Sequence, residues 1–250
     1  RVGTGGVSFE GKTQCSAAFA EVDCVVQFPK PDLYGNKKVD TEFLLVALKT
    51  PAVHGKQKLE SFVVQMATKN SLDLALDSAA LDASCLAALT AGLGEHLTDG
   101  GAVSGPEPTV LPQVLACMGS KPIGKPSPMV FSNSSGGAHV ACYRKVQEGF
   151  LYPLAEGLLF FKPPMLLKLH EIASMSTTAG GARFLELSVE MEDGTKHEFS
   201  NIDKGEVNGL QGYAQYVAKA HKTRAKVEAA AAAAEASGAG AGGDATSGVS

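Results

Sequence analysis

Two stretches of the chain contain the letters of phosphate-binding motifs, but both lack features that the chemistry requires. Residues 119–125 match GxxxxGK, the first seven positions of a nucleotide-binding phosphate loop. In that motif the eighth position is a Ser or Thr whose hydroxyl binds magnesium. That position is Pro126, and Pro122 removes another backbone N–H that would donate to phosphate. Residues 238–243 fit GxGxxG, but they follow an alanine run rather than a strand. We interpret the first stretch as a linker and the second as a flexible tail.

Residue types that bind metals or carry out covalent catalysis are scattered along the chain. The five cysteines contain no CxxC pair, and the six histidines have neither HxxxH spacing nor a cysteine at ligand spacing. An odd, dispersed set of cysteines favours reduced intracellular thiols. Glu186, Glu190 and Glu192 are predicted to share one strand face, where solvated surface is the ordinary explanation. We therefore predict no catalytic residues, no metal site and no cofactor, and we expect a binding protein rather than an enzyme.

Basic residues gather in short segments, although the formal net charge of the chain is −4. The whole chain is therefore not a binder of polyanions, and any contact with nucleic acid must come from a local patch. Such contact would be salt-sensitive and independent of base sequence, whereas solvated loops are the alternative explanation. The lysines in two predicted loops of the first half are Lys30, Lys37, Lys38, Lys49, Lys56 and Lys58. A further basic run, 219–226, leads out of the last predicted helix.

A segment rich in hydroxyls and glycines, residues 175–184, separates two predicted strands. A loop at the edge of a sheet places backbone groups where a partner peptide can meet them. A plain connecting loop is the alternative. The segment is therefore a candidate site for binding another protein.

The strands around this segment are predicted from alternating patterns in the second half of the chain. Apolar and polar side chains alternate over 185–192, as in a half-buried strand. Asp193 and Gly194 then favour a tight hairpin turn into a partner strand over 196–202. Short strands at this spacing indicate a barrel or sandwich of antiparallel strands. The earlier candidates are residues 140–146, 150–154, 158–161 and 166–172.

A helix is expected to close this barrel. Asp203 and Glu206 have the spacing of a helix N-cap and its reciprocal partner. Apolar residues over 207–217 then repeat at helical spacing, so one face of the helix can cover an open end of the barrel.

The first half of the chain resembles a weaker copy of the same order. Residues 22–28, 43–48 and 62–66 are predicted strands, and 81–97 a helix. The sequence thus predicts four segments, the first of which has its N-terminal strands missing. They are a first domain (1–99), a linker rich in Gly, Pro and Ser (100–137), a second domain (138–226) and a disordered Ala/Gly-rich tail (227–250).

Particular motifs of the second domain resemble a known family. Residues 143–154, 157–165 and 198–203 are similar to the second PH domain of Rtt-type histone chaperones. They are also similar to the middle domain of the structure-specific recognition subunit of the FACT complex. Residues 25–29 followed by 43–46 are similar to the first PH domain, and the resemblance covers about 7–225. It implies a mainly β fold with helices: tandem pleckstrin-homology-like barrels, each closed by a C-terminal α-helix.

The resemblance also implies a function. Such a module binds the core-histone three–four pair, assists nucleosome assembly with other chromatin-assembly factors in the nucleus, and contacts duplex DNA weakly and without sequence specificity. The lysine loops would correspond to the DNA-binding surface. The histone-binding loop of the family aligns with Ser176, Thr177, Thr178, Arg183 and Phe184. Between them this chain has small residues, 179–182, where the family loop has bulkier apolar ones.

Several alternatives are open at this point. The chain could be a fragment of a FACT-type subunit, since it starts at Arg1 with neither a methionine nor an apolar signal segment. It could be a PH-type scaffold for another nuclear protein. A lipid-binding PH module would gather cations in the first hairpin of the second domain, where only Arg144 and Lys145 occur before Glu148. We expect a soluble protein without membrane contact.

Overall fold

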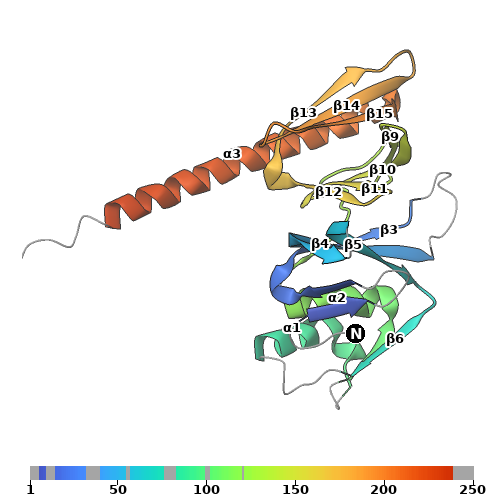
Figure 1. The fold of residues 1–250 in the computed structure, drawn as a ribbon, viewed down its shortest axis with the longest axis vertical. Helices are drawn as coiled ribbons and strands as arrows, with labels where there is room; N and C mark the ends of the chain where they lie inside the picture. Colours follow the sequence, from blue (N-terminus) through green and yellow to red (C-terminus); the bar gives the residue numbers. More distant parts are fainter. Residues whose placement is uncertain are drawn as a thin grey trace, which may run out of the picture.

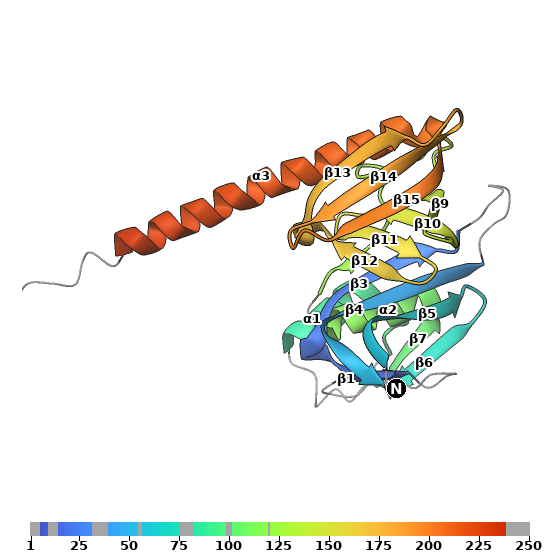
Figure 2. The same ribbon diagram turned by 45° about the horizontal axis from the view of Figure 1, so that its top comes forward.

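The computed structural model describes residues 6–9, 15–31, 40–54, 57–75, 83–98, 102–119 and 121–238, and it forms two stacked units (Figures 1 and 2). Apart from short 3-10 turns, the elements of the first unit are β1 (Gly6–Phe9), β2 (Cys15–Ala18), β3 (Val22–Pro29), β4 (Thr41–His54), β5 (Gln57–Ala67), β6 (Ser71–Ala75), α1 (Ala83–Leu93), β7 (Ala102–Pro106), α2 (Glu107–Gly119) and β8 (Ile123–Gly124). Those of the second unit are β9 (Val140–Arg144), β10 (Gln147–Pro153), β11 (Gly157–Phe161), β12 (Met165–Lys168), β13 (Ile172–Ala179), β14 (Phe184–Met191), β15 (Lys196–Asp203) and α3 (Val207–Gly238).

The first unit is built on a four-stranded sheet with the order β5-β4-β3-β8. Its central strands read as continuous apolar runs because both of their faces are covered. On β4, for example, Leu44 and Val46 face α2, while Phe43 and Leu45 face the second unit. β1–β2 and β6–β7 form separate two-stranded ribbons. The three predicted strands of this half, 22–28, 43–48 and 62–66, lie in β3, β4 and β5.

The predicted linker is wrong for residues 102–119 and 123–124, which form β7, α2 and β8 of the first unit. Leu111 and Leu115 of α2 pack on the first sheet, and Val110 and Val114 pack against α1. The predicted helix over 81–97 contains α1, but α2 is the helix that covers the sheet. This helix was not predicted because prolines usually disfavour a helix.

One buried side chain compensates for the hydrogen bond that α2 loses at an internal proline. Pro112 has no N–H to donate to the carbonyl of Pro108, four residues earlier. Gln27, which is 7% exposed, donates from its Nε2 to that carbonyl at 2.9 Å. Gln27 therefore replaces the missing helical hydrogen bond from the neighbouring strand.

We expect Gln27→Met to lower the free energy of unfolding by about 1–3 kcal/mol, because a buried carbonyl loses a donor. In a Pro112→Ala background residue 112 regains its N–H, so the same substitution should cost about 1 kcal/mol less. Urea unfolding of the four proteins measures this coupling. Equal costs in the two backgrounds would show that Gln27 does not serve Pro108.

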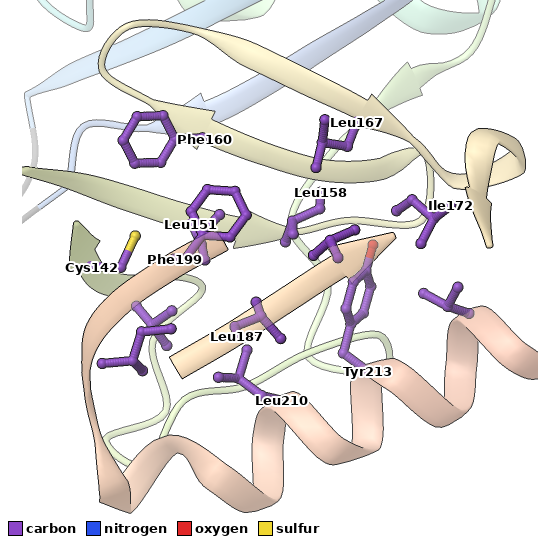
Figure 3. Close-up of a cluster of buried hydrophobic side chains, with 14 of the residues drawn as sticks. Cys142, Leu151, Leu158, Phe160, Leu167, Ile172, Leu187, Phe199, Leu210 and Tyr213 are labelled. Atoms are coloured by element: carbon purple, nitrogen blue, oxygen red, sulfur yellow. The ribbon is translucent and has the colours of Figure 1, made fainter. Parts of the chain in front are cut away.

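The second unit is one curled sheet of seven strands in the order β12-β11-β10-β9-β15-β14-β13. Neighbouring strands are antiparallel. Figure 3 shows Leu210 and Tyr213 of α3 pointing into the hollow of the sheet, toward Leu187 and Ile172. The predicted closing helix over 207–217 is thereby confirmed. Sequence analysis found six of the seven strands and missed most of β13.

The turns of this unit follow the sequence signals, with one correction. Asp193 Oδ1 accepts from the backbone N–H of Thr195 at 2.8 Å in the β14–β15 hairpin, as expected for the Asp-Gly turn. Asp203 Oδ1 accepts from Gly205 N at 2.8 Å and caps the helical segment. Glu206 does not complete the predicted reciprocal cap, because its carboxylate accepts from Ser134 N at 2.9 Å. Glu206 therefore fixes the segment that leads into β9.

The end of the chain differs from the predicted disordered tail. α3 is 32 residues long and continues through the alanine run to Gly238. Alanine has the highest helix propensity, so this stretch needs no packing partner to favour the helix. The remainder of the predicted tail, 239–250, lies outside the described residues.

The two units share a buried core at their seam. Val26, Phe28 and Leu45 of the first sheet pack against Tyr152 and other apolar side chains of β10 and β11. The Tyr152 hydroxyl donates to Pro29 O at 2.9 Å, and Lys168 Nζ lies 2.7 Å from Asp23 Oδ2. The units are thus joined by core packing as well as by the chain. The chain is mainly β with a C-terminal helix, as predicted, and its second unit is a curled half-barrel.

Candidate functional site

The segment predicted to bind a protein is mostly strand rather than loop. Ser176, Thr177 and Thr178 lie in β13, Phe184 begins β14, and residues 180–183 form the turn. β13 is an edge strand that pairs only with β14 in the sheet. Its solvent face requires no apolar residues, so the alternation that identifies a strand is weak there. The two neighbouring threonines were the signal that could have identified it, since Thr favours strands.

The pairing of β13 with β14 divides the predicted site residues between two faces. Thr178 pairs with Glu186 and Ser176 with Ser188, on the face that points to solvent. Thr177 pairs with Leu187, whose side chain is in the core, so Thr177 is half-buried on the inner face. The structure therefore brings Ser176 and Thr178 together and separates Thr177 from them.

The solvent face of this sheet is acidic. Glu190 on β14 pairs with Ser174 on one side and Lys196 on the other, where Lys196 Nζ lies 3.8 Å from Glu190 Oε1. Glu198 on β15 pairs with Ser188. We call this surface the outer face; its residues are Ser174, Ser176, Thr178, Glu186, Ser188, Glu190, Lys196 and Glu198. Three carboxylates and one ammonium group give it a negative charge.

Glu186 and Glu190 were predicted to be solvated surface, and Glu198 was not predicted to lie with them. The alternating Glu186 and Glu190 were the available signal. Glu192 does not share their face, because it lies in the turn after β14, with its Oε1 3.6 Å from His221 Nδ1.

The turn between β13 and β14 has its backbone fixed at both ends. Gly180 N donates to Phe184 O at 3.0 Å, and Lys204 N donates to Arg183 O at 3.1 Å. Gly181 has φ 126°, a conformation that favours glycine. The Arg183 side chain is exposed and Phe184 is 40% exposed. A cationic and an aromatic side chain are therefore presented at the end of the outer face.

Of the predicted DNA-binding lysines that the structure describes, Lys49 and Lys58 share a groove, whereas Lys30 lies in a different one. Lys37, Lys38 and Lys56 lie outside the described residues. Lys49 and Lys58 line a groove of about 510 Å³ at the seam. Lys49 Nζ donates to Ala20 O at 2.7 Å. Lys30 lines a different groove at the seam, of about 750 Å³, with Lys162 and three phenylalanines.

One partly buried carboxyl group belongs to the seam rather than to a reaction centre. Glu156 lies against the backbone of β8, since a Cβ on Gly124 would be 2.4 Å from Glu156 Cδ. Burial raises the pKa of this carboxyl group. Across the described ranges, no three His, Cys, Asp or Glu side chains are grouped so that they could hold a metal ion. In the same residues, no helix has the length and apolar character needed to cross a membrane.

Comparison with known proteins agrees with the resemblance found in the sequence. Residues 138–222 match the family model described as histone chaperone Rttp106-like, middle domain. The chain is 34% identical over 114 residues to the FACT complex subunit Ssrp1 of Drosophila melanogaster, covering 44% of this chain and 16% of that protein.

Two further relatives carry similar names. The FACT complex subunit SSRP1 of Dictyostelium discoideum is 25% identical over 216 residues, or 82% of this chain and 37% of that protein. The subunit POB3 of Yarrowia lipolytica is 30% identical over 92 residues, or 34% and 17%. The chain therefore spans between 16% and 37% of the length of these three relatives.

Proposed function

We propose, from the premise that residues 138–222 are similar to a histone chaperone middle domain, that this chain is the histone-binding module of a chromatin-assembly protein. It binds the core-histone three–four pair, assists nucleosome assembly in the nucleus together with other chromatin-assembly factors, and makes accessory contacts with duplex DNA. This role needs no catalytic group, since a chaperone covers a histone surface and releases it by competition.

The observation that carries this proposal is the acidic outer face beside the edge strand β13. Histones are strongly basic, so the carboxylates of Glu186, Glu190 and Glu198 complement their charge and accelerate their approach. The hydroxyls of Ser176 and Thr178 on the same face can donate to and accept from a peptide. Arg183 and Phe184 at the end of the face would add specific contacts, and Phe184 offers apolar area for burial.

The arrangement of two units supports the same role. We propose that both units derive from pleckstrin-homology-like folds, each a largely antiparallel sheet with a helix packed against it. Because they share a core, the pair offers a rigid platform on which the outer face keeps its shape before the histone arrives. A preorganised surface loses less conformational entropy on binding.

We expect Glu186→Gln/Glu190→Gln/Glu198→Gln to bind the histone three–four pair about tenfold more weakly than the parent chain at ~100 mM salt. The amides keep the shape of the face and remove its charge. Titration calorimetry with the purified histone pair measures the affinity, and a salt series should show a smaller salt dependence for the variant.

The matched control removes three exposed carboxylates elsewhere, in Glu21→Gln/Glu60→Gln/Glu148→Gln. It changes the net charge equally and should retain the affinity of the parent chain. Failure of the parent to bind histones would refute the proposed function. Equal losses in both variants would show that net charge, and not the outer face, governs binding.

Membership of a FACT-type assembly is the second candidate. The alignment with the Dictyostelium FACT subunit covers 82% of this chain, whereas the Rttp106-like model matches only 138–222. Similarity that extends into the first unit favours the FACT architecture. Co-purification of the chain with the other FACT subunit, dependent on residues of the first unit, is the expected result.

The predicted lysines are one candidate surface for the proposed accessory DNA contact. These lysines are Lys30, Lys37, Lys38, Lys49, Lys56 and Lys58. Their contact would be with phosphates, and therefore insensitive to base sequence.

A further inference from the structure

Only the first part of α3 packs against the second unit. Leu210, Tyr213 and Val217 are buried in the core, whereas every side chain from Lys222 to Val227 is exposed. Figures 1 and 2 show the rest of the helix projecting beyond the curled sheet. From Ala225 to Gly238 this projection is about 20 Å long, at a rise of about 1.5 Å per residue.

Two contacts fix which side of the helix faces the unit as it leaves the core. His221 Nδ1 lies 3.6 Å from Glu192 Oε1, and Arg224 Nη1 donates to His170 O at 3.0 Å. These residues follow Val217 by one and two helical turns, on the same side of the helix. The packed side of α3 therefore extends from Leu210 to Arg224.

Three lysines occupy the opposite side. At about 100° per residue, Lys219, Lys222 and Lys226 fall within about 60° of one another and point away from Val217. All three side chains are exposed. We call them the lysine stripe. The sequence contains no Asp or Glu from Val207 to Val227, so no acidic side chain of this segment neutralises the stripe.

We propose that the lysine stripe of α3 binds the phosphate backbone of duplex DNA. The stripe is about 10 Å long, which equals the rise of about three nucleotides along one strand of B-DNA. Lysines are point charges without a planar fork, so this contact carries affinity and no base specificity.

This inference rests on the DNA contact of the proposed function and moves that contact from the loops to α3. The described loop lysines are divided between two grooves of the seam, and the ammonium of Lys49 is already bonded to a carbonyl. The three lysines of the stripe instead lie next to one another on one side of a single helix. The stripe is the stronger candidate because adjacent cations release several condensed counterions together.

The test compares two variants with equal changes of charge. Lys219→Gln/Lys222→Gln/Lys226→Gln removes the stripe and keeps good helix formers. Lys69→Gln/Lys125→Gln/Lys145→Gln is the control, because these lysines are exposed and lie outside both the stripe and the predicted loops. Fluorescence anisotropy of a labelled 30-base-pair duplex over a salt series gives the affinity. The stripe variant should bind about tenfold more weakly at ~100 mM salt, with a log–log salt slope less negative by about 2–3. The control should lose less than about threefold.

The outcomes separate this inference from the proposed function. The stripe variant should capture histones like the parent chain, because the outer face is unchanged. If the parent binds DNA and the stripe variant binds it equally well, the stripe is not the contact. If the parent binds no DNA, both the stripe and the proposed loop contact are refuted, while histone binding is judged by its own assay. Stripe-dependent binding to phosphatidylserine vesicles without binding to DNA would assign the stripe to membranes and overturn the proposal.

Discussion

Phe28→Ala is expected to destabilise both units by about 3–5 kcal/mol, although Phe28 belongs to the first. The side chain is fully buried at the seam, with its ring centroid 5.0 Å from that of Tyr152 and 5.3 Å from that of Phe161. Truncation removes these contacts and leaves a cavity bounded by both sheets. Native-state hydrogen exchange should therefore show faster opening of β10 and β11 as well as β3 and β4.

The control for this experiment is Leu93→Ala on α1. Leu93 is 1% exposed and packs in the cluster between α1, α2 and β7, away from the seam. It should accelerate exchange in the first unit and leave β10 and β11 protected. If Phe28→Ala also leaves these strands protected, the two units open independently and the shared core does not couple them.

The second unit could be predicted well from the sequence because its strands carry local signals. Leu185 to Met191 alternate with polar residues, Asp193 and Gly194 mark the turn, and α3 has an apolar face. Each signal lies within a few residues of the element that it specifies. Most of β13 was not predicted, because it is an edge strand along which apolar and polar side chains alternate only weakly.

The first unit was harder because its prolines depend on distant residues. Pro112 predicts a break in a helix unless another group satisfies the carbonyl of Pro108. That group is the side chain of Gln27, which is 81 residues away along the chain. No local pattern records such a contact. The local sequence around Pro112 does disfavour a helix, and a tertiary contact from Gln27 nevertheless allows α2 to form.

The position of the candidate site could be predicted from the sequence, but its negative charge and the face on which each residue lies could not. The segment 175–184 was identified from its composition. The carboxylates of the outer face lie on β14 and β15, outside that segment, and only strand pairing brings them beside it. The pairing also decides that Thr177 faces inward and Ser176 outward. Residues that share a face across three strands cannot be recognised before the register is known.

The charges of the second unit are separated by its core. Leu187 on β14 and Leu210 on α3 point into the same cluster, so this cluster lies between the outer face of the sheet and the solvent side of the helix. A basic histone on the outer face and DNA on the stripe would therefore not compete for space.

Two buried tyrosines are expected to make the stability of the chain fall at alkaline pH. The Tyr213 hydroxyl donates to Leu154 O at 3.0 Å, and the Tyr152 hydroxyl donates to Pro29 O. Burial raises the pKa of both phenols above that of an exposed tyrosine. Because the folded state holds these protons more tightly, their contribution is complete below about pH 10 and is lost as the pH rises above it.

We expect the free energy of unfolding of the parent chain to fall by about 1.4 kcal/mol per pH unit for each tyrosine above pH ~10. Tyr152→Phe/Tyr213→Phe should start lower by about 1–3 kcal/mol at neutral pH, because two hydrogen bonds are lost. Its stability should then decline less steeply with pH. Urea unfolding between pH 7 and about 11 compares the two proteins, so the titration of lysines common to both cancels in the difference. Parallel curves would mean that neither phenol is held neutral by the fold, and that the closure of the half-barrel by α3 does not depend on a protonated Tyr213.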